Sequence, residues 1–463
     1  MRIKLNPSHI NRRNFLKLLG ASAVLPKILS STSARANEAK AYPQISLKEA
    51  AGNRFNPMVA FPRGDIGNRN AEIFASLNRY LESVNPAKMY RLALGKPLED
   101  IFKFARENNL PIAPHSLFWF NEAVLNTTEW GEKFSSLINR LNSGEDVVSE
   151  LKKELINYVQ FAIEKIDNTV EKFSGPQIPF LELINEPLVL KPEDIPSRYI
   201  SDAMSTLYYA RIDGSGRFAG LTRERLLNTP FKINGNDFTP LDVLSQSNVE
   251  VPLRGLGKGL FPDMDSLASV VNEALRLWPG EINISETDLL QKGREEKRIA
   301  FLQFLSSLLS RVDKENHQRI LVNMQSHWIP QDPETPEDLI EQVDPEIQRY
   351  LSLIKAFGIG GLGISEHDFV CPDLNISLEF LQAYFDSLKG SDIKFFGLWG
   401  YRTEPGGWLD NRFQKFYPGQ PNYALPGDTI PLDPNEHPFL SGNNILYNVY
   451  VDGYKSMGLT LST

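Results

Sequence analysis

The sequence predicts an α/β protein whose single domain is a (β/α)₈ TIM barrel, and three observations lead to this class. Short apolar runs of strand length alternate with segments in which apolar residues recur at helical spacing. This alternation is typical of parallel βαβ units. Eight strand candidates follow one another along the chain, and polar residues gather where several of them end. A closed barrel explains these features, and an open, doubly wound sheet is the structural alternative.

The predicted elements follow in chain order. The strands are Pro57–Phe61, Val84–Tyr90, Ile112–Trp119, Phe180–Ile184, Glu281–Ser285, Ile320–Met324, Leu362–Ile364 and Ile393–Trp399. Helices are predicted where apolar residues recur three and four positions apart. These helical patterns cover Leu98–Ala105, Val148–Ile166, Glu296–Leu309, Ile347–Ile354, Phe380–Leu388 and Ile445–Met457.

Two segments do not follow this alternation. The stretch from about Leu190 to Leu260 is rich in Gly, Asn and Ser, and we predict that it is a long insertion after the fourth strand. The proline-rich segment Gly406–Gly442 is predicted to be an irregular loop before the last helix.

The first 36 residues have the layout of an export signal. A basic start is followed by the apolar stretch Phe15–Leu29, which is too short and too charged to span a membrane. Where the basic start meets this stretch, Asn11–Lys17 resembles the twin-arginine export signal, and an ordinary secretory signal is the alternative. We therefore expect a signal peptide at residues 1–36, a linker at 37–44 and the barrel at 45–463, in the periplasm or outside the cell.

The charge balance restricts the partners. Cleavage after Ala36 removes seven basic residues and leaves 42 basic against 57 acidic residues, a formal net charge of −15. Such a surface repels phosphate backbones and anionic lipid, so we expect no nucleic-acid partner and no membrane anchor after cleavage. Cys371 is the only cysteine, which excludes an internal disulfide and suits a small structural residue. We expect a monomer.

Polar side chains mark the ends of the predicted strands, where a barrel carries its active site. Two of them are carboxylates, Glu186 after the fourth strand and Glu366 after the seventh, which would face each other across the barrel mouth. Glycoside hydrolysis requires one protonated and one ionised carboxyl group. His327 is placed to donate to Glu366, and Asp368, on the same strand face as Glu366, is placed to orient His327.

In order, these strand ends resemble glycoside hydrolase family 10, the barrels of the endo-β-1,4-xylanase type. The resemblance rests on His-x-x-x-Trp, Asn-Glu, Gln-Ser-His, Ser-Glu-x-Asp and Trp-Gly, and runs from Ser46 to about Trp408. It implies that Glu186 is the acid/base and Glu366 the nucleophile of a retaining mechanism, and that Asn185 binds the sugar's 2-hydroxyl. It further implies a glycone subsite lined by His115, Trp119, Gln325, Trp399 and Trp408.

The sequence departs from the family pattern around these residues. Near the end of the second strand, Lys88 is the candidate sugar ligand, although Lys88 and Met89 stand in swapped order and Pro86 replaces an asparagine. Phe120 stands where the family has a histidine, and His367 replaces an apolar residue. The catalytic pair is unchanged, so the departures bear on which β-glycan is the substrate.

The prediction is an endo-β-1,4-glycosidase, xylanase-like, that acts on a polysaccharide or oligosaccharide without a cofactor or metal. A clan A glycosidase or transglycosylase of other specificity, and a non-catalytic glycan-binding barrel, are the alternatives. For the carboxylates the alternative is a structural ion-pair network, and a cluster of His327, His367, Glu366 and Asp368 could hold a metal. The glycine motif Gly358–Gly363 precedes a strand and opens no helix, so it does not indicate a dinucleotide site.

Overall fold

The computed structural model describes the greater part of the chain from residue 45 onward. The described residues are 45–61, 75, 77–83, 96–119, 128–173, 177–187, 231–233, 236–238, 261, 264–292, 294–330, 335–400, 413–425 and 445–457. The predicted signal peptide at 1–36 and linker at 37–44, together with Lys88 and Trp408, lie outside them, as does the side chain of Trp119.

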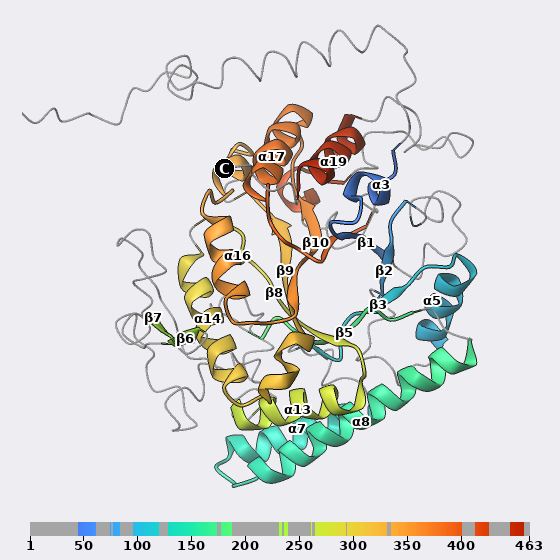
Figure 1. The fold of residues 1–463 in the computed structure, drawn as a ribbon, viewed down its shortest axis with the longest axis vertical. Helices are drawn as coiled ribbons and strands as arrows, with labels where there is room; N and C mark the ends of the chain where they lie inside the picture. Colours follow the sequence, from blue (N-terminus) through green and yellow to red (C-terminus); the bar gives the residue numbers. More distant parts are fainter. Residues whose placement is uncertain are drawn as a thin grey trace, which may run out of the picture.

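A sheet of nine parallel strands, counted within the described residues, forms the centre and is curled into a half-barrel (Figure 1). The strands pair in the order β3-β2-β1-β11-β10-β9-β8-β5-β4. Because every pair is parallel, the C-terminal ends of the strands share one edge of the sheet. The strands are β1 (Asn56–Phe61), β2 (Tyr80–Ser83), β3 (Ile112–Pro114), β4 (Phe118–Trp119), β5 (Phe180–Asn185), β8 (Glu281–Glu286), β9 (Ile320–Trp328), β10 (Gly361–Phe369) and β11 (Phe395–Leu398).

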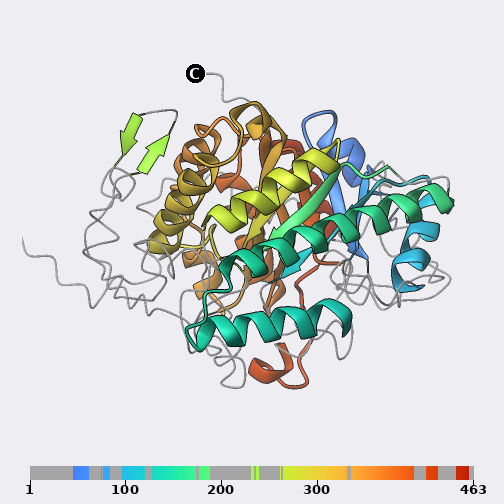
Figure 2. The same cartoon turned by 90° about the horizontal axis from the view of Figure 1, so that it is seen from below.

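Helices cover the outside of the sheet, with α17, α19 and α3 together on one side and α7, α8 and α13 together on another (Figures 1 and 2). Their apolar faces are buried; on α8, for example, Leu151 and Leu155 are fully buried. Asp373 caps α17 by accepting from two backbone N–H groups. The helices are α3 (Leu47–Ala51), α5 (Lys96–Glu107), α7 (Thr128–Asn142), α8 (Val148–Lys172), α13 (Met264–Leu277), α14 (Glu295–Leu309), α15 (Asp338–Glu341), α16 (Ile347–Lys355), α17 (Leu374–Ser387) and α19 (Ile445–Ser456).

Most predicted elements are confirmed, and the differences are local. The predicted third strand, Ile112–Trp119, is divided into β3 and β4 by residues 115–117. The second strand lies at Tyr80–Ser83, before the predicted range Val84–Tyr90, which falls outside the described residues. Four helices, α3, α7, α13 and α15, were not predicted.

Little of the predicted insertion at Leu190–Leu260 belongs to the described residues. Its described part is a separate antiparallel pair of strands, β6 (Phe231–Ile233) and β7 (Asn236–Phe238). None of the helices in the described part of the chain is long and apolar enough to cross a membrane.

The inside of the sheet is layered from apolar to polar. The lower layer is an apolar cluster built around Phe180, Leu321 and Phe395. Gly363 is required next to it, because a Cβ atom there would lie 2.0 Å from Cζ of the Phe395 ring. Above it, towards the C-terminal ends of the strands, lie the buried polar side chains Glu182, Asn283, Ser285, Asn323 and Ser365. This polar layer supports the candidate site.

Candidate active site

The predicted carboxylates have an unusual backbone conformation: Glu186 directly follows β5, and Glu366 lies in the C-terminal part of β10. Glu186 and Glu366 both have φ of 52°, and they are two of four non-glycine residues with positive φ among the described residues. This left-handed region is sparsely populated by side-chain-bearing residues, and strained backbone of this kind concentrates at functional sites. The N–H of Glu186 donates to the carbonyl of Ser285 on the neighbouring strand at 2.7 Å.

Register shifts turn the side chains of the site inward. Side chains alternate between the two faces of a strand, so one extra residue reverses the faces beyond it. The pairing of β10 with β9 shifts between Ser365 and Asp368. The pairing of β5 with β8 shifts between Glu182 and Ile184. As a result Glu366 joins Ser365 on the inner face.

The carboxylate of Glu366 lies between two imidazoles. Its Oε2 is 3.1 Å from Nε2 of His327, and its Oε1 is 3.7 Å from Nδ1 of His115. Each imidazole has a second carboxylate behind it. Nδ1 of His327 lies 2.7 Å from Oδ1 of Asp368, and Nδ1 of His115 lies 2.9 Å from Oε2 of Glu182. The predicted contacts of Glu366, His327 and Asp368 are therefore present.

This arrangement fixes the charge of His327. Burial lowers the pKa of the imidazole, but the charges and hydrogen bonds of Asp368 and Glu366 more than offset burial and raise this pKa from 6.5 to about 10. A protonated imidazole donates from both ring nitrogens. His327 can therefore donate to Asp368 and to Glu366 at the same time at neutral pH.

Asn185, Gln325 and Trp399 complete the wall of the site. The side-chain amide of Gln325 donates to Oδ1 of Asn185 at 2.6 Å, and both side chains are buried. The half-buried ring of Trp399 stands edge-to-face to two histidines, with ring centroids 6.3 Å from His115 and 5.7 Å from His327. Of the candidate residues whose side chains are described, His115, His327, Glu366 and Trp399 lie in one connected group with Asp368 behind it, and Asn185 and Gln325 form a hydrogen-bonded pair.

The two carboxylates differ in their access to solvent. Glu366 is only 4% exposed, whereas Glu186 is half-buried. A proton can reach Glu186 from solvent more readily than it can reach Glu366.

His367 faces away from this group and does not form a metal cluster with it. Its Nδ1 lies 3.0 Å from Oγ of Ser326, and its ring stacks on Tyr384 with centroids 4.7 Å apart. Burial, with a smaller effect from the charge of His327, lowers the pKa of His367 to about 3, so this imidazole is neutral. Among the described residues, no group of three or more His, Cys, Asp or Glu side chains is arranged to hold a metal ion.

Two buried carboxylates in the strands were not singled out from the sequence. Glu182 is 2% exposed and orients His115, and Glu286 is fully buried at the end of β8, where it accepts from the N–H of Thr287 at 2.9 Å. The available signal for Glu182 was an acidic residue inside an otherwise apolar strand, which is costly unless the residue has a partner.

Solved structures share this fold. Xylanase B from Clostridium stercorarium F9 aligns with a TM-score of 0.50 at 14% sequence identity, over 82% of this chain and 94% of that one. A thermostable mutant of a xylanase from Cellvibrio japonicus aligns with a TM-score of 0.51 at 15% identity, over 88% of this chain and 99% of that one. The described half-barrel is thus similar in fold to these xylanases. No protein-family model matches the sequence, and no curated protein matches it either.

Proposed function

We propose that the protein is a retaining β-glycosidase that cleaves a β-linked polysaccharide or oligosaccharide through a glycosyl-enzyme intermediate. The observation that carries the proposal is the buried Glu366 carboxylate, which a protonated His327 holds at 3.1 Å. A nucleophilic carboxylate must stay ionised and point at the reacting carbon. His327, fixed by Asp368, supports both requirements at Glu366.

The proposal includes a complete (β/α)₈ barrel with an insertion after its fourth strand. The two outer strands of the sheet, β3 and β4, are joined by only residues 115–117. Hydrogen bonds also link this outer segment to β5 and to the residues before β5: the N–H of Ile112 in β3 donates to the carbonyl of Gln177 at 2.9 Å, and the N–H of Leu117, between β3 and β4, donates to the carbonyl of Glu182 in β5 at 3.0 Å. Both observations support closure between the third and fourth barrel strands.

In the proposed reaction, Glu366 attacks the anomeric carbon while Glu186 protonates the departing glycosidic oxygen. Glu186 then removes a proton from water, and this water releases the sugar from Glu366. The half-buried position of Glu186 supports this role, because the acid/base must exchange its proton with solvent. Asn185, held by Gln325, is proposed to bind the 2-hydroxyl, and His115 and Trp399 to contact the glycone.

The proposed substrate is a β-1,4-linked glycan such as xylan, cleaved internally. It is supported by the fold shared with xylanases, one of which is described as complexed with xylohexaose. We also propose that residues 1–36 export the protein, because of their basic start and apolar stretch. Trp119, Trp408 and Lys88 remain proposed glycone ligands from the sequence alone.

The test is hydrolysis of aryl β-glycosides and of a polysaccharide panel by Glu186→Gln, Glu366→Gln and the exposed control Glu379→Gln. We expect the Glu186 variant to lose about 100- to 10,000-fold in rate. We expect the Glu366 variant to lose more, and the control to match wild type. Wild-type rates in both active-site variants would refute the proposal. Glycan binding by wild type without turnover on any substrate would instead identify a non-catalytic glycan-binding protein.

A further inference from the structure

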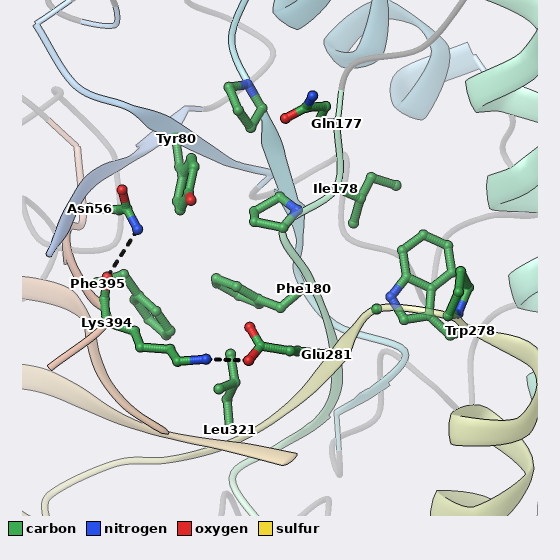
Figure 3. Close-up of a pocket in the computed structure, with 14 residues that line it drawn as sticks. Asn56, Tyr80, Gln177, Ile178, Phe180, Trp278, Glu281, Leu321, Lys394 and Phe395 are labelled. Carbon is green, nitrogen blue, oxygen red and sulfur yellow. Dashed lines mark hydrogen bonds and ion pairs between the residues drawn. The ribbon is translucent and has the colours of Figure 1, made fainter. Parts of the chain in front are cut away.

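A cavity opens at the opposite end of the strands from Glu366. It has a volume of about 650 Å³, within the range of about 300–1,000 Å³ typical of small-molecule sites. It is lined by residues from the starts of strands, among them Asn56, Tyr80, Phe180, Glu281 and Phe395 (Figure 3). Along a strand such as β9, six residues span roughly 20 Å, so this cavity is remote from the candidate active site.

The cavity has an apolar floor. Phe180 and Phe395 stack with centroids 4.6 Å apart and an interplanar angle of 22°, and Leu321 lies beside them. These side chains leave no polar group at the floor. A ligand that reaches it must present an apolar face.

The walls of the cavity supply hydrogen-bonding groups. Trp278 is 7% exposed, and its indole Nε1 has no hydrogen-bond partner among the described residues. Figure 3 shows Tyr80 and Trp278 on opposite sides, with the indole nitrogen towards the cavity. The pKa of the Tyr80 phenol is raised, mainly by burial, so this group is a neutral O–H donor. A buried N–H without a partner costs free energy that a ligand acceptor would recover.

Gly280 lies directly beside the buried indole N–H of Trp278. A Cβ atom on Gly280 would lie 2.8 Å from Nε1 of Trp278, closer than a side-chain carbon normally approaches. Gly280 itself lines the cavity. The absence of a side chain there leaves room for a ligand oxygen next to the indole.

The charges of the cavity neutralise each other. Lys394 and Glu281 form an ion pair within the lining (Figure 3). Neither a free ammonium nor a free carboxylate is therefore available to select a charged ligand, which favours a neutral one. A pyranose ring is neutral, and it carries an apolar C–H face together with a rim of hydroxyl groups, a combination that matches aromatic side chains with polar tips.

We propose that this cavity is a second saccharide-binding site, in which a neutral sugar ring contacts the aromatic floor and accepts hydrogen bonds from Trp278 and Tyr80. Catalysis at Glu366 is not required for this binding.

The test follows the indole N–H signals of Trp278 and Trp399 by NMR in the Glu366→Gln background, which removes the proposed nucleophile. The Trp278→Phe and Trp399→Phe spectra assign the two signals. Xylohexaose, cellohexaose and laminarihexaose serve as probes. We expect saturable shifts of both signals with separate dissociation constants. Tyr80→Phe should weaken the constant at Trp278 by about fivefold, the factor that one neutral hydrogen bond provides, and leave that at Trp399 unchanged.

A second variant, Gly280→Ala, should abolish the shift at Trp278 and preserve that at Trp399. A Trp278 signal that stays constant while Trp399 shifts would overturn the second site and leave the proposed function intact. A shift at Trp278 alone would support the second site and contradict the proposed active site. If neither signal shifts with any of the probes, both proposals are contradicted. Shifts at Trp278 that neither variant alters would also overturn the second site.

Discussion

Replacing Asp368 by asparagine should change the protonation of His327 and, through it, the reactivity of Glu366. Asp368 is 1% exposed, and its Oδ1 lies 2.7 Å from Nδ1 of His327. The amide has nearly the same shape but no charge. Loss of a neighbouring opposite charge shifts a pKa by about 1–3 units. We expect the pKa of His327 to fall from about 10 by this amount, towards neutrality.

The chemical consequence arises at Nε2 of His327. A neutral imidazole has a single N–H. Asp368 stabilises the tautomer with that proton on Nδ1, so neutral His327 would turn a bare lone pair towards Oε2 of Glu366, 3.1 Å away. Two acceptors at this distance repel each other. In wild type this loss is delayed to about pH 10. In Asp368→Asn the charge that stabilises the Nδ1 tautomer is absent, so what is lost at lower pH is the positive charge beside Glu366.

Stability should follow the same titration. Because the folded-state pKa of His327 lies above the unfolded value of 6.5, its contribution is fully present below pH 6.5 and is lost as the pH rises towards 10. At about 1.4 kcal/mol per pKa unit, the loss is at most about 5 kcal/mol in wild type. It should be smaller, and complete at lower pH, in Asp368→Asn.

The assay combines a direct and a kinetic measurement. NMR of the His327 ring reports its titration. Hydrolysis of a dinitrophenyl β-glycoside reports the attack of Glu366, because so good a leaving group needs no protonation by Glu186. Asp373→Asn is the matched control, since asparagine caps α17 as well as aspartate does. The reasoning is refuted if wild type and Asp368→Asn show the same pKa for His327 and the same alkaline limb in the pH dependence of the hydrolysis rate. Asp368 would then not set the charge of His327.

Three further outcomes can be measured. Glu182→Gln should lower kcat/KM about 10- to 100-fold, because His115 loses a charged acceptor. Initial rates measured across pH check this loss, and an unchanged melting temperature shows that the variant is still folded. Gly363→Ala should reduce the free energy of unfolding by about 1–3 kcal/mol, since its Cβ would overlap the Phe395 ring, and urea denaturation would reveal an unchanged midpoint if the ring can move. Arg298→Ala should cost about 3–5 kcal/mol, because it leaves Asp344 buried without its partner, and thermal unfolding measures the loss.

The fold was predictable where strands are buried on both faces. Such strands form largely apolar runs, as at Phe180–Ile184 in β5 and Ile320–Met324 in β9, and the alternating helices show one apolar face. β2 was missed because Tyr80–Ser83 is four residues long and half polar. Only its pairing with β1 and β3 makes it a strand. Short strands of this kind depend on their neighbours and leave little local signal.

The candidate site was predictable as a set of residues but not as a geometry. Glu366, His327 and Asp368 were identified because they lie just beyond the apolar runs by which the sequence reveals β9 and β10. Glu182 was not identified, because its partner His115 lies 67 positions away and neither strand shows the contact locally. The register shifts that turn these side chains inward are relations between two strands, and a pattern within one strand does not contain them.

The polar layer below the site shows how the geometry of the candidate site depends on the fold. Asn323 on β9 donates through one amide nitrogen to Ser285 on β8 at 3.0 Å and to Ser365 on β10 at 2.5 Å. It thereby ties together three adjacent strands immediately below Glu366. Each of these residues, taken alone in the sequence, is a small polar side chain in an apolar run. Their value lies in holding β9 and β10 at fixed separation, and that separation sets the distance between His327 and Glu366. The proposed nucleophile Glu366 and its imidazole partner His327 therefore rest on uncharged residues such as Asn323 and Ser285, which lie outside the motifs that identified the site.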